Sequence, residues 1–132
     1  DLVVRNSTGP GVLLWKGGIQ GSYWDISNNG ATGLDIREFH PDLFLVSSHN
    51  NSGHGVSVID SSNVELEQIH TSSNGLGTVL PSSGSGIYFH ESNDVVCAGK
   101  NVSCTNCSST HDQHGVVIRD SIDIFLDGIT SN

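Results

Sequence analysis

The amino-acid sequence predicts an all-β fold, a right-handed parallel β-helix (a solenoid) of about five to six coils. Three observations carry this prediction. A phrase that begins with Gly and continues with alternating apolar residues recurs along the chain. The apolar residues are mostly Val, Ile and Leu in short runs, as strands require. Finally, the apolar residues do not recur at i, i+3, i+4 and i+7, so a helical interpretation fails.

The repeated phrases divide the chain into coils. They read GVLLWK, GLDIRE, GVSVID, GIYFHE and GVVIRD, and their leading residues are Gly11, Gly33, Gly55, Gly86 and Gly115. A bare coil of about 22 residues holds three short strands and three turns. We therefore expect residues 1–132 to form a single β-helix segment, with loop insertions near 71–85 and 98–114.

Alternation along each strand predicts the interior, because successive side chains of a strand point to opposite faces. The expected inward residues are Val12, Leu14, Leu34, Ile36, Val56, Val58, Ile87, Phe89, Val116 and Ile118 on first strands, Leu43, Leu45, Val64, Leu66, Val95, Cys97, Ile124 and Leu126 on second strands, and Ile69 and Ile129 on a third.

The phrases GVSVIDSSNVEL, GIYFHESNDVVC and GVVIRDSIDIFL resemble the repeats of the right-handed parallel β-helix superfamily. That superfamily includes pectate-lyase-like proteins, phage tailspikes and the β-helix repeats of surface proteins. The resemblance covers nearly the whole chain and implies architecture rather than activity. Because neither end carries a capping element, we expect an excerpt of a longer solenoid, or neighbouring chains that stack on both ends.

An acidic residue stands five positions after the repeat glycine in four coils, and the coils would stack these carboxylates into a ladder. The four residues are Glu38, Asp60, Glu91 and Asp120. They either cap turns by accepting backbone N–H bonds or, helped by Asp94 and Asp123, bind a structural calcium ion. No other cofactor is expected.

The outward residues of the first strands form two columns, one of Leu13, Asp35, Ser57, Tyr88 and Val117 and one of Trp15, Arg37, Ile59, His90 and Arg119. Trp15, Tyr88 and His90 are candidates for contact with carbohydrate, because aromatic rings stack on sugar faces. The apolar members of the columns favour the alternative that another chain or a loop covers this face. If the protein is an enzyme, a polysaccharide lyase or a glycoside hydrolase, the catalytic candidates are His90, Glu91, Arg119 and Asp120.

Cysteines and sequons supply the remaining candidate sites. Cys97 paired with Cys104 or Cys107 would form a disulfide, which suits an oxidising compartment. The alternatives are free thiols or a zinc site made of Cys104, Cys107, His111 and His114, whose spacing departs from that of the usual finger. Four sequons predict N-glycosylation at Asn6, Asn50, Asn101 and Asn106.

The net charge of the chain restricts the classes of partner that it is expected to bind. The chain has 14 acidic and 5 basic residues, a formal net charge of −9. Nucleic acid and membrane insertion are therefore not expected, whereas self-association, end to end or lateral, and contact with polysaccharide are. We expect an extracellular, cell-surface or virion-surface location. The two function classes are a non-catalytic structural rod, filament subunit or adhesive, glycan-contacting stalk, and a polysaccharide-acting lyase or hydrolase.

Overall fold

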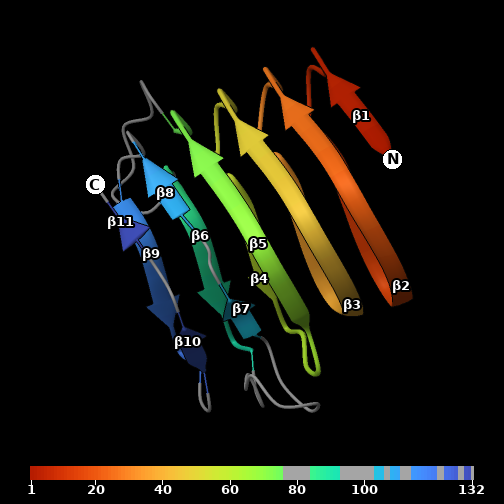
Figure 1. Cartoon of the computed structure of the whole chain (residues 1–132), viewed down its shortest axis with the longest axis vertical. Coiled ribbons are helices and arrows are strands. Elements are labelled where there is room, and N and C mark those ends of the chain that lie inside the picture. Colours follow the sequence, from red (N-terminus) through yellow and green to blue (C-terminus); the bar gives the residue numbers. More distant parts are fainter. Residues whose placement is uncertain are drawn as a thin grey trace.

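The computed structural model describes residues 1–75, 84–92, 103–105, 108–110, 114–121, 124–127 and 130–131. Every element in these ranges is a strand, and every strand pairing is parallel. The strands are β1 (Leu2–Arg5), β2 (Val12–Ser27), β3 (Leu34–His49), β4 (Val56–Ile59), β5 (Glu65–Ser72), β6 (Ser85–His90), β7 (Ser103–Thr105), β8 (Ser108–Thr110), β9 (His114–Arg119), β10 (Phe125–Asp127) and β11 (Thr130–Ser131). Figure 1 shows them stacked side by side, with β1 and β11 at opposite ends.

The stacked strands form a β-solenoid, which confirms the fold class. The ladder of the first strands runs through Val12, Leu34, Val56, Ile87 and Val116, each opposite the next. These residues directly follow the five repeat glycines, so the predicted phrases stack in register. The described residues make about three turns rather than the five to six expected.

Corner residues with a left-handed backbone separate the strand segments of each coil. A corner of this kind stands at the same place in successive coils, in three columns: Asn6, Asn28, Asn50 and Ser73; Lys16, Glu38, Asp60, Glu91 and Asp120; and Tyr23, Leu45 and Gln68. Alternation restarts after a corner, because the corner residue turns the chain. Leu45 was predicted to point inward and this is wrong: it is a half-buried corner, and Val46 is fully buried in its place.

The interior is otherwise the predicted one. The fully or almost fully buried side chains include Leu34, Ile36, Leu43, Val56, Val58, Val64, Leu66, Ile69, Ile87 and Phe89. Trp24 joins them at 7% exposure. Ile118 departs from its prediction, since it lies opposite buried Phe89 but is 47% exposed. Within the described ranges β9 pairs only with β6, so nothing there covers its other side. Val95, Cys97 and Ile129 lie outside the described residues.

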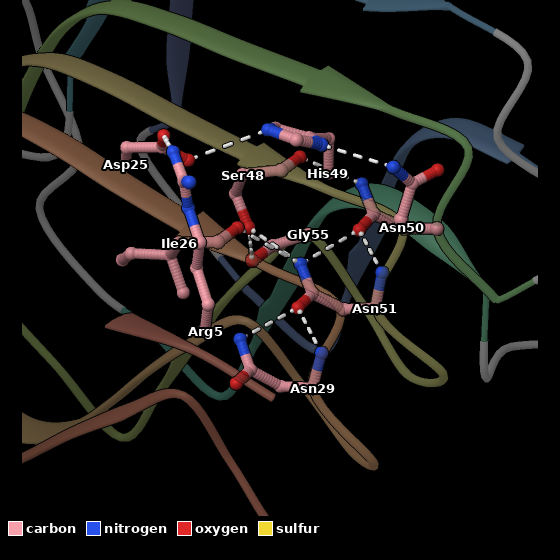
Figure 2. Close-up of polar contacts among 10 residues, drawn as sticks. Arg5, Asp25, Ile26, Asn29, Ser48, His49, Asn50, Asn51 and Gly55 are labelled. Atoms are coloured by element: carbon pink, nitrogen blue, oxygen red, sulfur yellow. Dashed lines mark hydrogen bonds and ion pairs between the residues drawn. The ribbon is translucent and has the colours of Figure 1, made fainter. Parts of the chain in front are cut away.

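A ladder of buried asparagines joins successive coils at the corner that follows the third strand. Asn29, Asn51 and Asn74 are at most 2% exposed. Oδ1 of Asn51 accepts hydrogen bonds from the backbone N–H (3.1 Å) and the side-chain amide (2.9 Å) of Asn29, and Asn74 accepts the same pair from Asn51. The Asn51 amide also donates to Ser48 Oγ, which in turn donates to the carbonyl of Gly55 (Figure 2). The ladder therefore satisfies backbone groups that the parallel sheets leave unpaired.

The repeat glycines are required because they pack against this ladder. A Cβ atom added to Gly33 would lie 2.6 Å from the amide nitrogen of Asn51 and 2.8 Å from the carbonyl oxygen of Gly55, and it would also strike Ser48 Oγ. Gly11 and Gly55 meet Asn29 and Asn74 in the same way. Gly11, Gly33 and Gly55 thus leave the space that the asparagine amides near the ends of the same coils occupy.

Gly33→Ala should therefore lower the free energy of unfolding by about 1–3 kcal/mol or more, because the added methyl group overpacks buried polar groups that cannot move independently. Urea unfolding followed by circular dichroism measures this change. Gly9→Ala is the matched control, since a Cβ atom there would meet nothing within 4 Å. We expect the control to leave stability within about 1 kcal/mol of the parent chain. Equal effects of the two substitutions would contradict the packing of glycine on asparagine.

Candidate functional site

The acidic ladder forms one corner column and faces solvent. Glu38, Asp60, Glu91 and Asp120 all have a left-handed backbone and exposed side chains. In three of these coils, the serine that follows the acid accepts a hydrogen bond from the backbone N–H at the corner of the preceding coil. Ser61, Ser92 and Ser121 lie in successive coils; their hydroxyls accept from the backbone N–H groups of Phe39 (3.3 Å), Ser61 (3.4 Å) and Ser92 (3.1 Å). Turn capping by the carboxylates themselves stays a prediction.

The two outward columns predicted from the sequence are the observed registers of the first strands. Leu13, Asp35, Ser57, Tyr88 and Val117 lie opposite one another in turn, and so do Trp15, Arg37, Ile59, His90 and Arg119. The structure places the three predicted carbohydrate-contacting residues on this face, but not together. Trp15 lies on β2, whereas Tyr88 and His90 lie on β6, three coils further along, roughly 14 Å at the usual strand spacing.

A groove of about 490 Å³ hollows the face around Trp15. Three successive coils line it, and the sequence had not indicated it as a unit. The lining residues are Pro10, Leu13, Trp15, Asp35, Arg37, Glu38, Ile59 and Asp60. Trp15 is 61% exposed and Leu13 is 54% exposed, so the first coil supplies an open apolar wall. The second and third coils supply the charged groups.

A buried carboxylate fixes the guanidinium of the groove. Asp35 is only 4% exposed. Its Oδ2 accepts from Arg37 Nε at 2.9 Å and lies 2.7 Å from Arg37 NH2, while its Oδ1 accepts from the Ser57 hydroxyl at 2.6 Å. The hydrogen bond to Asp35 raises the pKa of Arg37 above its already high value. Arg37 is therefore committed to Asp35 and is not a free cation for an acidic ligand.

Glu38 orients the indole ring of Trp15 from the next coil. Its Oε1 accepts from Trp15 Nε1 at 3.4 Å, and its Oε2 lies 3.4 Å from Lys16 Nζ. The same ammonium lies 5.1 Å from the centroid of the Trp15 ring, within the range of a cation–π contact. Trp15, Lys16 and Glu38 thus form one exposed cluster at the edge of the groove.

Further along the solenoid, three rings lie nearly parallel. His54 stacks on Tyr88 at 4.5 Å between ring centroids, and Tyr88 lies 6.0 Å from His90. Nδ1 of His54 accepts from the backbone N–H of Ser85 at 3.2 Å, which requires the neutral imidazole. Burial lowers the pKa of His54 to about 4, against a smaller opposing effect of Asp35. One face of Tyr88 is therefore already covered by a neutral histidine.

The four catalytic candidates do come together. His90 Nδ1 lies 3.9 Å from Glu91 Oε2, and His90 Nε2 lies 3.6 Å from Asp120 Oδ2, so the imidazole bridges two carboxylates of neighbouring coils. Arg119 Nε lies 3.3 Å from the same Asp120 oxygen. Both carboxylate side chains are more than half exposed. Among the described residues these carboxylates are therefore solvated rather than desolvated, unlike the general acids that enzymes tune by burial.

A second charged network lies beside the asparagine ladder (Figure 2). Asp25 accepts a hydrogen bond from Arg5, and its other oxygen lies 3.3 Å from His49 Nε2. The hydrogen bond from Arg5 holds the pKa of Asp25 below its usual range, and His49 adds to this effect. These residues come from three successive strands, β1, β2 and β3, so the network ties coils together on the outside as the asparagines do inside.

The remaining candidates have only partial descriptions. Asn6 and Asn50 are exposed corner residues, whereas Asn101 and Asn106 lie outside the described residues. Cys97, Cys107 and His111 also lie outside them, as do Asp94 and Asp123. Cys104 belongs to β7 and His114 begins β9. Within the described ranges no group of three or more His, Cys, Asp or Glu residues is arranged to hold a metal ion. Disulfide, zinc and calcium therefore stay predictions.

No protein-family model, no curated protein and no solved structure matches the chain. In the part of the chain that the structure describes, no helix is long and apolar enough to cross a membrane.

The neutral, half-buried state of His54 should make stability depend on pH. Since the pKa of about 4 in the folded chain lies below the ordinary 6.5, the unfolded chain takes up the proton first as pH falls. The His54 contribution is intact above pH 6.5 and is lost between pH 6.5 and 4, at up to about 1.4 kcal/mol per pH unit. Urea unfolding at pH 7 and pH 5 measures it. His54→Phe should reduce this dependence, whereas the control His40→Gln, at an exposed histidine, should retain it. An unchanged dependence in His54→Phe would refute the assignment.

Proposed function

We propose that this chain is part of a non-catalytic extracellular rod, a stalk that holds its shape and contacts glycans through one face. The single observation that carries the rod is the way each coil is fixed to the next. Three kinds of bond join neighbouring coils along the solenoid axis. They are the parallel backbone pairing, the buried asparagine ladder and the hydrogen bonds that corner serine hydroxyls accept from the backbone of the preceding coil. A structure stabilised by such axial bonds resists bending and has no hinge within the continuously described residues 1–75.

An extracellular location is supported by the surface chemistry. Asn6 and Asn50 belong to sequons and stand exposed at corners, where a glycan would not displace any core residue. The net charge of −9 keeps a rod of stacked coils soluble and opposes lateral aggregation.

Contact with glycans is supported by the Trp15 groove. An exposed indole beside fixed polar groups is the usual composition of a sugar-binding surface, because the ring stacks on the sugar face and the polar groups bond its hydroxyls. The groove runs across three coils, so an extended chain could lie along the rod rather than end in a pocket.

A polysaccharide-acting enzyme is the second candidate function, and the bridging of Glu91 and Asp120 by His90 is the observation that favours it. We rank it below the rod because both carboxylate side chains are more than half exposed among the residues that the structure describes. Hydrolases of this kind place their two carboxyl groups on either side of the scissile bond. Here the imidazole already occupies the space between them.

Electron microscopy of the native full-length protein tests the rod. We expect unbranched rods of constant width, and incubation with a panel of neutral, acidic and amino polysaccharides should release no new reducing ends. Compact particles would count against the rod. Cleavage of a polysaccharide that disappears in Glu91→Gln/Asp120→Asn, but persists in the matched pair Glu65→Gln/Asp42→Asn on the neighbouring face, would establish the enzyme instead.

A further inference from the structure

The Trp15 groove carries an excess of negative charge. Three of its lining side chains are carboxylates, namely Asp35, Glu38 and Asp60, whereas Arg37 is the single cation among them. Because Asp35 neutralises Arg37, the groove presents Glu38 and Asp60 to a ligand. Asp60 is exposed and forms no ion pair within 4 Å among the described residues, and it interacts with Arg37 only at longer range. The groove is therefore suited to a ligand with positive charge.

Lys16 shows what kind of cation fits. Its ammonium group contacts the face of Trp15 and lies beside the carboxylate of Glu38, at the rim of the groove. Both contacts are weak, because the Lys16 side chain is 60% exposed and that of Glu38 is 50% exposed. A primary amine brought by a ligand could replace Lys16 as the partner of Glu38 at little cost. If it lay on the groove side of Glu38, it could also bond Asp60, which stands at the same corner one coil further on.

We propose that the groove binds a glycan whose sugars carry free primary amines, that is, 2-amino-2-deoxy sugars without their acetyl groups. The sugar ring stacks on Trp15, and its ammonium group lies between Glu38 and Asp60. This assignment rests on the glycan contact proposed above and names the chemical class of the glycan. It also sets the direction of charge selection, toward cationic and away from acidic polysaccharides.

The described cations oppose binding of an acidic polysaccharide. Arg5, Lys16, Arg37 and Arg119 each lie in an ion pair with a carboxylate. An acidic sugar would have to break such a pair and would approach a chain of net charge −9. The geometry therefore does not favour binding of acidic sugars by the arginines of this face.

Calorimetric titration of the full chain with glucosamine tetrasaccharide and with its fully N-acetylated counterpart tests the proposal at low salt. The amine form should bind at least about tenfold more tightly, and added salt should weaken its binding. Glu38→Gln and Asp60→Asn should each weaken it about fivefold or more, and Trp15→Ala should weaken both sugars. Trp15 emission gives a second readout, because the other tryptophan, Trp24, is buried.

Two controls separate the groove from general attraction to an acidic surface. Asp42→Asn removes the same charge from an exposed residue of another hollow and should leave binding unchanged. Tyr23→Ala removes an aromatic ring that is as exposed as Trp15, and it should also leave binding of the sugars unchanged. Lys16→Gln should tighten binding of the amine sugar about two- to fivefold, because it removes a competing ammonium group.

Each other outcome is decisive. Equal binding of the acetylated sugar would overturn amine selection while leaving the proposed glycan contact intact. Equal loss in Asp60→Asn and Asp42→Asn would overturn the site. A lysine-rich peptide that binds more tightly than the sugar, with the same response to the groove variants, would make the partner a protein. Failure of both sugars to bind would overturn the glycan contact, and electron microscopy would still decide the rod on its own.

Discussion

The contact between a repeat glycine and a buried asparagine amide is the constraint on which the rest of this solenoid depends. A coil can lie at strand-pairing distance from its neighbour only if the corner amide fits inside, and it fits only where the facing residue has no Cβ atom. In return, the amide of Asn51 bonds the backbone of one neighbouring coil and the side chain of the other. A polar interior column is thus stable because each of its groups is paired along the axis.

The sequence revealed half of that contact. Repeated glycines and alternating apolar residues sufficed for the parallel solenoid, the register of its first strands and most of its core. The asparagines were present in the sequence at spacings of 22 and 23 residues, at Asn29, Asn51 and Asn74, but they look like ordinary turn residues. Their number and spacing could have indicated a ladder, since exposed turns need not repeat one residue type.

The error at Leu45 originates in the corners. Period-two alternation holds along a strand but ends at a residue with a left-handed backbone, and sequence alone did not show that Leu45 was such a residue. Burial of His54 and the grouping of Pro10, Trp15 and Asp60 in one groove depend on how three coils stack, which no single coil encodes.

The columns of stacked residues are of two kinds, which have different roles. Some repeat one residue type in every coil, and others change residue type from coil to coil. Columns that repeat one residue type, such as the glycines, the asparagines and the corner serines, form continuous bonds along the axis and have no group to spare for a ligand. The column of Trp15, Arg37, Ile59, His90 and Arg119 changes its chemistry at every coil. Where the residue type changes between neighbouring coils, side chains of unequal size and charge lie beside one another. Such differences form a groove in the surface and make the groove selective for a ligand. Ligand binding is therefore expected where equivalent positions of successive coils carry different residue types, and the Trp15 groove is such a place.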